Sequence, residues 1–452
     1  MSGVAARPVP RRLDVASVVE LVRGLREGRL DPGQVLAEHV ARIAAADELN
    51  AFLWAEPERL LAEARRADVA GRPLAGLPVA VKDNIDTAGI PTTSGSPVDG
   101  GRVPATDALA WRRLRDERGA TLLGKTHMSE FAYRSHHPAL GWVRNPRRLD
   151  RATGGSSSGS AAAVSAGLAP AALGSDTGGS VRIPAAYCGV VGIKGTFGLV
   201  ENDGLVPLST TMDHIGVLAR SVADAAIVFE QLPATALRLV DPESLAVREA
   251  EPRELRVGLE RRYFLAGAQP PVVRAWARSV ARLEEAGCRV SEIRLAAARR
   301  WRAAHKVILR HEAWEYHAAR IHAGAPYGPV FRESMEAGAA ITVREYERAL
   351  GVRRAALDEL DEVFRSVDVI VTPTCPTVAP AVEEGRRALA YTRYTTMAAF
   401  AGVPAASIPA GTGHLGLPIG VQLIAAKSAE ATLFGAAALL ERLIGPDRDR
   451  AA

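Results

Sequence analysis

From residue 77 onward, short apolar runs alternate with longer amphipathic segments, and this alternation narrows the choice of folds more than any other feature. The run Leu77–Val81 is too short for a buried helix and is typical of a buried strand. Further strands are predicted at 121–123, 171–174, 256–260, 369–372 and 419–424, and helices at 107–118, 161–166, 225–232, 271–286, 353–366 and 428–443. Such alternation favours one α/β domain in which helices cover both faces of a sheet.

The residues before this region have the periodicity of helices. Two amphipathic helices are predicted there, the first capped by Asp14 and the second by Asp31, and a third is predicted at 57–70. We therefore expect an N-terminal helical segment, residues 1–74, that packs on a main domain spanning 75–445.

Composition excludes several classes of protein. The longest apolar stretches fall far short of the ~20 residues that a membrane span needs, so the sequence excludes a membrane protein. The net charge is +5, but only five of the 56 cations are lysines, and the arginines are spread along the chain among acidic residues. A protein that binds nucleic acid would gather them on one face, so no nucleic-acid partner is predicted.

The three cysteines, Cys188, Cys288 and Cys375, lie far apart and form no CxxC pair. Neither a disulfide framework nor a structural zinc site fits this spacing. The N-terminus lacks the apolar core of a secretory signal, so we expect a cytoplasmic protein. No metal constellation or nucleotide motif stands out, so no cofactor is expected. The choice between a monomer and a homodimer stays open.

A glycine- and serine-rich stretch at 153–160 allows three interpretations. Gly155–Gly159 matches the G-x-S-x-G elbow of α/β hydrolases, but that motif needs an apolar strand before it, and Arg147–Thr153 is polar. A phosphate-binding loop would need a lysine after the last glycine, and none is there. A flexible linker is the third interpretation, and composition alone favours it.

A second turn of small residues, Ser175–Ser180, follows a predicted strand. Adjacent glycines let backbone N–H groups converge, as an oxyanion hole requires, and a serine at the end of the turn could be a nucleophile. Such a serine needs a base. His311 opens an HExxH-like stretch, but Glu315 stands where the second histidine is required. Lys82, at the end of a buried strand, is the other candidate base, although a lysine reaching solvent explains it equally well.

The chain resembles the amidase signature family of serine hydrolases in three stretches that occur in the family's order, and three shorter stretches extend the match. These are Val79–Asn84, Gly154–Ser160 and Gly174–Pro184, then Ala186–Lys194, Asp213–Gly216 and Thr372–Thr374. The resemblance is dense over about 75–230 and looser over 365–443. It implies a single amidase-signature domain with a mixed central β-sheet of about eleven strands, covered by helices on both faces.

The resemblance also implies the roles of individual residues. Ser180 matches the nucleophile that forms the acyl-enzyme, Ser156 the bridging serine with a cis peptide bond, and Lys82 the base. The backbone N–H groups of the oxyanion hole would come from Thr177, Gly178, Gly179 and Ser180.

A base lysine must be neutral, yet at its ordinary pKa of about 10.4 almost none is neutral at pH 7. Burial can lower the pKa of a lysine by ~3–5, because desolvation disfavours the ammonium. We therefore predict that Lys82 is buried and neutral, and that it takes the proton of Ser156, which in turn takes that of Ser180.

The sequence departs from the family pattern at three places outside these roles. Ser158 replaces a glycine, Gly195 stands where a proline is common, and His127 replaces a frequent asparagine. Asp176 and Arg182 flank the second turn, and we expect them to pair and hold it.

The resemblance implies that the protein is an amidase. It would hydrolyse the C–N bond of a small-molecule amide through an acyl-serine intermediate and release ammonia or an amine. Two alternatives stay open. One is the A subunit of a glutamyl-tRNA amidotransferase complex, which we disfavour because residues 305–350 do not match its glutamine-recognition segment. The other is an allophanate- or biuret-type hydrolase of urea derivatives, which often has the Gly-Gly-Ser-Ser-Ser-Gly-Ser loop seen here. A non-catalytic scaffold is disfavoured, because all three triad positions are present.

The acyl pocket is expected to be shaped by the segments 127–143 and 300–345. The aromatic residues Trp301, Trp314 and Tyr316 would either line this pocket or belong to the core, and we favour the core. For Met128, Phe131 and Tyr133, the sequence does not decide between the pocket wall and the core.

Overall fold

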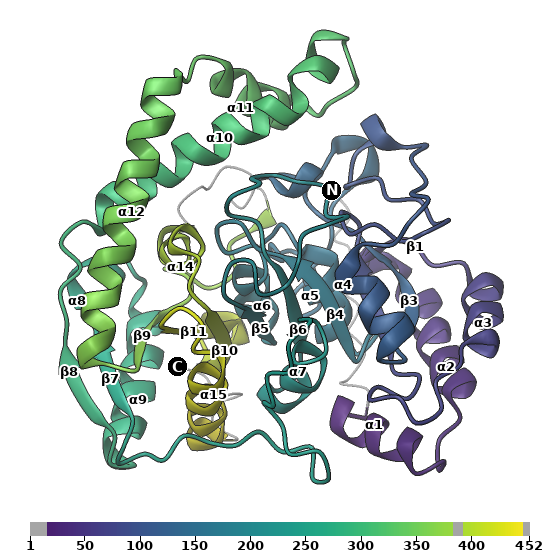
Figure 1. The fold of residues 1–452 in the computed structure, drawn as a ribbon, viewed down its shortest axis with the longest axis horizontal. Coiled ribbons are helices and arrows are strands. Elements are labelled where there is room, and N and C mark those ends of the chain that lie inside the picture. The colour runs from purple at the N-terminus through teal and green to yellow at the C-terminus, as the bar shows by residue number, and fades with distance from the viewer. Residues whose placement is uncertain (1–15, 383–391, 446–452) are drawn as a thin grey trace, which may run out of the picture.

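The computed structural model describes residues 16–382 and 392–445, and an eleven-stranded mixed sheet runs through it (Figure 1). The strand order is β1-β3-β2-β4-β6-β5-β10-β11-β9-β7-β8. The strands are β1 Phe52–Trp54, β2 Pro78–Lys82, β3 Thr121–Thr126, β4 Ala171–Ser175, β5 Val191–Lys194, β6 Ile215–Ala219, β7 Arg256–Leu259, β8 Arg289–Glu292, β9 Val369–Pro373, β10 Ala405–Thr412 and β11 Pro418–Ala425. The predicted α/β class with a mixed sheet is confirmed.

Every predicted strand is present, and the sequence missed five: β1, β5, β6, β8 and β10. Near one end of the sheet, β2 pairs in parallel with both β3 and β4, while β4, β6, β5, β10, β11 and β9 form a run of antiparallel pairs. Parallel β7 and β8 complete the other end. The missed strands β5 and β6 are short and contain glycine, which hides them from a search for apolar runs.

The helices are α1 Val18–Arg26, α2 Pro32–Ala45, α3 Pro57–Arg66, α4 Leu109–Arg112, α5 Ser158–Ser165, α6 Arg182–Cys188, α7 Val222–Phe229, α8 Arg261–Phe264, α9 Pro270–Glu285, α10 Ala298–His322, α11 Pro329–Ala339, α12 Val343–Ser366, α14 Thr396–Ala401 and α15 Glu430–Ile444. Several predicted helices have boundaries that differ from the observed ones. The helix predicted at 57–70 ends at Arg66, and the helices predicted at 161–166 and 225–232 begin at Ser158 and Val222. The helix predicted at 353–366 is α12, which begins at Val343 because Thr342 and Glu345 form a capping box there. The helix predicted at 107–118 is present over nearly the same residues, as α4 followed directly by a π-helical turn at Arg113–Glu117.

The first helix begins later than predicted. Asp14, the predicted cap, lies outside the described residues, and the N-cap of α1 is Ser17, which forms a capping box with Glu20. The backbone N–H of Val19 donates to the Asp224 carboxylate of α7 at 3.1 Å. The second predicted cap is confirmed, because the Asp31 side chain accepts from the N–H of Gln34 at the start of α2.

Helices cover both faces of the sheet (Figure 1). The helices α7, α9 and α15 contact the central strands and α15 touches both others, while α5 and α6 contact each other and the sheet. A Cβ atom on Gly192 of β5 would lie only 2.7 Å from the Cβ of Ala185 in α6. Glycine in β5 therefore lets α6 lie directly against the sheet.

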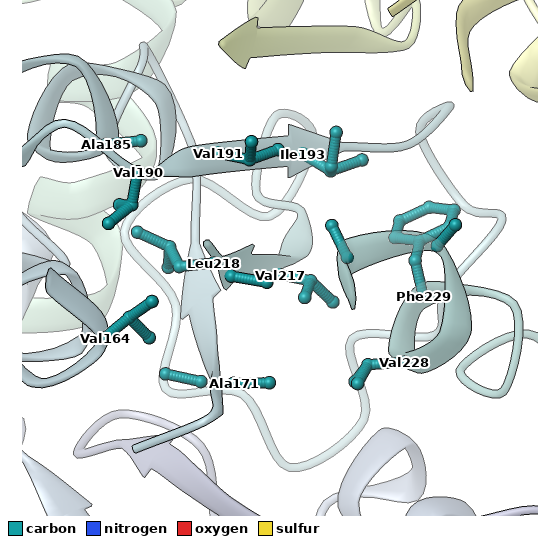
Figure 2. Packing of buried hydrophobic residues seen from close by; sticks show 14 of the residues in the cluster. Val164, Ala171, Ala185, Val190, Val191, Ile193, Val217, Leu218, Val228 and Phe229 are labelled. Atoms are coloured by element: carbon teal, nitrogen blue, oxygen red, sulfur yellow. The ribbon is translucent and has the colours of Figure 1, made fainter. Parts of the chain in front are cut away.

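The main hydrophobic core lies between the sheet and its helices. Figure 2 shows Val191 and Ile193 of β5, Val217 of β6, and Val228 and Phe229 of α7 within this cluster. A second cluster lies where α10, α11, α12 and α14 pack together. The longer helices α10, α11 and α12 run along one border of the molecule, and the short α14 lies inside them (Figure 1). Among the described residues, none of the helices has the length and apolarity to cross a membrane.

Candidate active site

The ends of two parallel strands place the first polar groups of the site. Strands β2 and β4 are paired in register, with Val81 opposite Leu173, so Lys82 and Ser175 leave the sheet at the same edge. The run Pro78–Lys82 is buried throughout, which carries a cationic side chain into the interior.

Lys82 lies among hydroxyl groups and is completely buried. Its Nζ is 2.7 Å from Ser156 Oγ and 2.8 Å from Ser175 Oγ, and Asn84 Nδ2 donates to Ser175 Oγ at 3.1 Å. Burial lowers the pKa of Lys82 to about 7, although the charges of Asp176 and Asp213 act to raise it. A substantial share of Lys82 is therefore the neutral amine near pH 7, which agrees with the prediction of a buried, neutral lysine.

The glycine- and serine-rich stretch forms the turn into α5. It is therefore neither a flexible linker nor the strand-to-helix elbow of an α/β hydrolase. The peptide bond between Gly155 and Ser156 is cis, as the resemblance implies. The N–H of Ser129 donates to the carbonyl of Ser156, and the N–H of Ser157 donates to the carbonyl of Ser180, both at 3.1 Å. The second of these bonds joins the two serine-containing turns, and the first ties Ser156 to the segment after β3. Ser156 is buried and Ser180 is half-buried.

The predicted pair of Asp176 and Arg182 is confirmed, and both side chains are fully buried. Arg182 Nη2 lies 2.8 Å from Asp176 Oδ1. The Asp176 carboxylate also accepts hydrogen bonds from the backbone N–H groups of Gly179 and Val181. Burial alone would raise the pKa of Asp176, but the charge and hydrogen bonds of Arg182 outweigh it and hold that pKa well below its ordinary value. The pair thus fixes the turn that ends at Ser180.

Contacts from distant parts of the chain complete this turn. Thr395 Oγ1 donates to the carbonyl of Gly178 at 2.7 Å, and His305 Nε2 donates to the carbonyl of Thr177 at 2.8 Å. Gly179 has φ +126°, and a Cβ atom there would lie 2.1 Å from Thr395 Oγ1, so the position requires glycine. The N–H of Gly179 is directed to Asp176 at 2.7 Å.

Ser156 and Ser180 open onto a cavity of about 430 Å³. Both segments expected to shape an acyl pocket line it, 127–143 through residues such as Tyr133 and His136, and 300–345 through residues of α10. Thr177 and Gly178 also lie on its wall.

The aromatic residues of α10 belong to the core, as favoured from the sequence. Trp301 is buried in the second cluster, and Trp314 and Tyr316 pack against it. Of the three undecided residues, Tyr133 borders both the cavity and this cluster, while Met128 and Phe131 are buried in the cluster only.

Two of the departures from the family pattern meet beside the cavity. Ser158 Oγ and His136 Nε2 are within hydrogen-bond distance at 2.8 Å, and the ring of His127 packs edge-on against that of His136, with centroids 4.9 Å apart. His136 therefore acts as a link between the turn into α5 and the cavity wall.

Sequence reasoning missed four residues that hold the site: Ser175, Asn84, His305 and Thr395. Ser175 could have been found, because it ends a strand parallel to β2. His305 and Thr395 lie more than 100 residues from the turn that they contact, and no local pattern marks them. Among the described residues, no group of three or more His, Cys, Asp or Glu is placed to hold a metal ion.

Comparisons with known proteins identify one family over most of the chain. A family model described as amidase matches residues 34–434. The A subunit of the glutamyl-tRNA(Gln) amidotransferase of Moorella thermoacetica is 37% identical, over 94% of this chain and 95% of that protein. The corresponding protein of Thermus thermophilus is 38% identical, over 93% of this chain and 96% of that protein.

Solved structures extend the likeness to the whole fold. A crystal structure described as an amidase is 32% identical with a TM-score of 0.85, covering 95% of this chain and 100% of that one. An inhibitor-bound complex tied to the origins of an s-triazine catabolic enzyme is 34% identical with a TM-score of 0.86, covering 96% and 100%. The glutamyl-tRNA(Gln) amidotransferase A subunit from Thermotoga maritima is 32% identical with a TM-score of 0.77, covering 94% of each chain. The chain therefore belongs to the amidase signature family and is a hydrolase that acts on carbon–nitrogen bonds.

Proposed function

We propose that this chain is an amidase that cleaves small-molecule amides through an acyl-enzyme on Ser180. The observation that supports this most is the buried contact between Lys82 Nζ and Ser156 Oγ at 2.7 Å, next to the cavity that Ser180 also lines. A neutral amine there has one lone pair, and the hydroxyl of Ser156 is placed to donate to it. Ser175 Oγ, at 2.8 Å, receives an N–H of the same amine and directs that lone pair toward Ser156.

In the proposed first step, Ser180 Oγ attacks the amide carbonyl carbon while its proton passes to Ser156 and that of Ser156 passes to Lys82. The negative charge that develops on the carbonyl oxygen is met by the N–H groups of Thr177, Gly178 and Gly179, each worth ~3 kcal/mol of barrier where it is well aligned. Because the N–H of Gly179 also serves Asp176, we expect Thr177 and Gly178 to contribute more.

The tetrahedral intermediate then collapses with cleavage of the C–N bond. The proton held by Lys82 returns through Ser156 to the leaving nitrogen, so ammonia or an amine departs and an ester to Ser180 remains. Water, deprotonated by the same relay, attacks this ester and releases the carboxylic acid. The cycle returns both serines and Lys82 to their starting protonation states.

The comparisons favour a second candidate, the A component of a glutamyl-tRNA amidotransferase, because the relatives from Moorella and Thermus carry that name. In that case ammonia would pass to a partner rather than to solvent. The TM-score of 0.85 to the structure described as an amidase, against 0.77 to the Thermotoga protein, supports the amidase instead.

Ammonia release by the purified chain separates the candidates. The panel contains glutamine, allophanate, biuret, and aliphatic and aryl primary amides, with Ser180→Ala as the blank and Ser244→Ala, an exposed serine, as the matched control. We expect release that Ser180→Ala abolishes and Ser244→Ala retains, with hydroxylamine trapping the acyl group as a hydroxamate. Release from glutamine alone that rises with a co-purifying protein would favour the amidotransferase. Release that survives Ser180→Ala would contradict the proposal.

A further inference from the structure

Three consecutive carbonyl groups in the turn before Ser180 each accept a hydrogen bond from a side chain of a distant segment. They are the carbonyls of Asp176, Thr177 and Gly178. Their respective donors are His214 Nδ1 at 3.0 Å, His305 Nε2 at 2.8 Å and Thr395 Oγ1 at 2.7 Å. A carbonyl oxygen can only accept, so the ring nitrogen of each histidine that faces it carries the proton. These bonds therefore fix three successive peptide groups of the turn.

The same three peptide groups carry the N–H groups of Thr177, Gly178 and Gly179. In a trans peptide the C=O and the N–H point in opposite directions, so a donor bound to the carbonyl sets where the N–H points. The N–H of Gly179 donates to the Asp176 carboxylate at 2.7 Å. Neither the N–H of Thr177 nor that of Gly178 has a partner among the described residues. Both of these N–H groups belong to the peptides that the two histidines hold.

Both histidines are buried and neutral near pH 7. Burial lowers the pKa of His305 to about 4 and lowers that of His214 well below its ordinary value. The charge of Asp176 opposes this shift, and the charges that add to it are those of Arg182, Lys194 and Arg353. Nε2 of His214 has no hydrogen-bond partner among the described residues, which suits a ring with its one proton on Nδ1. Each ring is therefore a single donor with a fixed direction.

A hydrogen bond to a carbonyl also changes the N–H of the same peptide group. It polarises the group, so that its N–H becomes a stronger donor, and electrostatic effects of this kind are larger in a buried site. Donors that already point to the place where negative charge develops need no reorganisation when the charge appears. Both effects favour a transition state with a negative oxygen over the uncharged carbonyl of a bound amide.

We propose that His214 and His305 are positioning residues of the oxyanion hole. Each holds, through the carbonyl of one peptide group, the N–H of that group toward the oxygen of the tetrahedral intermediate on Ser180. This inference rests on the proposed function, because it assigns roles in the same reaction. Neither ring takes part in proton transfer, so the relay from Ser180 through Ser156 to Lys82 is unchanged.

Removal of each ring donor tests this role. His305→Leu should lower kcat about tenfold or more with KM unchanged, because the bond matters most when the oxyanion forms. His214→Leu should lower kcat less, about threefold, because the backbone N–H of His214 still donates to the Asp176 carbonyl at 3.1 Å. Since both rings are neutral, the ratio of wild-type to variant kcat should be the same at pH 6 and at pH 9.

Amide side chains can restore the two donors. The side-chain nitrogen of glutamine takes the place of a histidine Nε2, and that of asparagine takes the place of Nδ1. His305→Gln and His214→Asn should therefore recover most of the kcat that the leucine variants lose. If neither amide variant is faster than its leucine counterpart, the reaction does not depend on these donors and the inference is wrong.

His39→Leu is the matched control. His39 is also buried, on α2, and its Nδ1 bonds to the carbonyl of Leu168 at 3.0 Å, so it makes the same kind of contact away from the cavity. We expect His39→Leu to lose about as much stability in a denaturant titration as His305→Leu and to keep its kcat. An equal fall of kcat in these two variants, or a wild-type kcat in His305→Leu, would overturn the inference.

A measurement without turnover separates this inference from the proposed function. A sample with ¹³C at threonine carbonyls and ¹⁵N at glycine selects the amides of the Thr–Gly pairs, which are 153–154, 177–178 and 412–413. We expect His305→Leu to move the ¹⁵N signal of Gly178, and His305→Gln to keep it near its wild-type position, with Gly413 as the internal reference. That result supports the positioning even if no amide is hydrolysed, in which case only the proposed reaction fails. A Gly178 signal that His305→Leu leaves in place would overturn the inference while leaving the proposed amidase intact.

Discussion

Lys82 sets the pH dependence of the proposed reaction. The reacting form is the neutral amine, and burial lowers its pKa to about 7, so kcat/KM should rise as the pH increases through that value and level off above it. We expect this limb when an amide without ionisable groups is assayed between pH 5 and 10. If kcat/KM instead rises only near pH 10, the ordinary pKa of a lysine, then Lys82 is not the base or is not desolvated.

We expect Ser175 to position Lys82 for the proposed reaction. Ser175→Ala removes the oxygen 2.8 Å from Nζ, so the lone pair of the amine is no longer directed toward Ser156. We expect kcat to fall about tenfold or more with KM unchanged. The rise of kcat/KM with pH should also move to lower pH. The ammonium form of Lys82 loses a hydrogen-bond acceptor in this variant, which lowers the pKa of Lys82.

Ser160→Ala is the control for this change. Ser160 is also buried, on α5, and its hydroxyl donates to the carbonyl of Leu173 without touching Lys82. If both variants lose stability alike and neither moves the pH limb, Ser175 serves only the packing.

Lys82, Ser156 and Ser180 could be identified from the sequence because each lies in a local motif with its own spacing. The structure places Ser156 and Ser180 on one cavity and Lys82, fully buried, in contact with Ser156. Their catalytic roles remain a proposal. Thr395 and His305 could not be identified, because they reach the turn at 177–179 only through the folded chain.

At the scale of elements, the strand that carries Lys82 was predictable, and the helix that follows Ser180 was not. The apolar run of β2 is buried on both sides, which makes its pattern continuous. Helix α6 has only seven residues and contains a proline, so it shows no clear helical period. Its place depends on the close contact with β5 at Gly192.

Gly192→Ala tests that contact. The added methyl group would lie 2.7 Å from the Cβ of Ala185 and 3.0 Å from the carbonyl oxygen of Val181, so α6 must move away from the sheet. We expect a loss of ~1–3 kcal/mol in the free energy of unfolding, measured by denaturant titration. The value of kcat should fall as well, because α6 begins two residues after Ser180.

The matched change is Gly351→Ala in α12. A Cβ atom at Gly351 meets nothing within 4 Å, so this variant should gain ~0.5–1 kcal/mol from the better helix propensity of alanine and keep its activity. Equal stability of the two variants would mean that α6 does not lie in close contact with the sheet.

For the molecule as a whole, the predicted division between residues 1–74 and 75–445 remains untested, and the packing indicates how the two parts should behave. Strand β1 lies in the N-terminal segment and pairs with β3 at the edge of the sheet. The main core cluster contains Leu36 of α2 together with Val217 and Phe434. A segment that shares both sheet and core with the rest should not unfold separately.

Native-state hydrogen exchange can decide this. Leu36 is fully buried, so Leu36→Ala should cost ~2–5 kcal/mol, whereas Glu38→Ala, on an exposed side chain of the same helix, should change stability by at most ~0.5 kcal/mol. If the two parts unfold together, Leu36→Ala lowers the protection of slowly exchanging amides in α2 and in the distant strand β10 by the same free energy. Lower protection confined to residues before 75 would instead show that the N-terminal segment opens independently of the sheet to which it contributes β1.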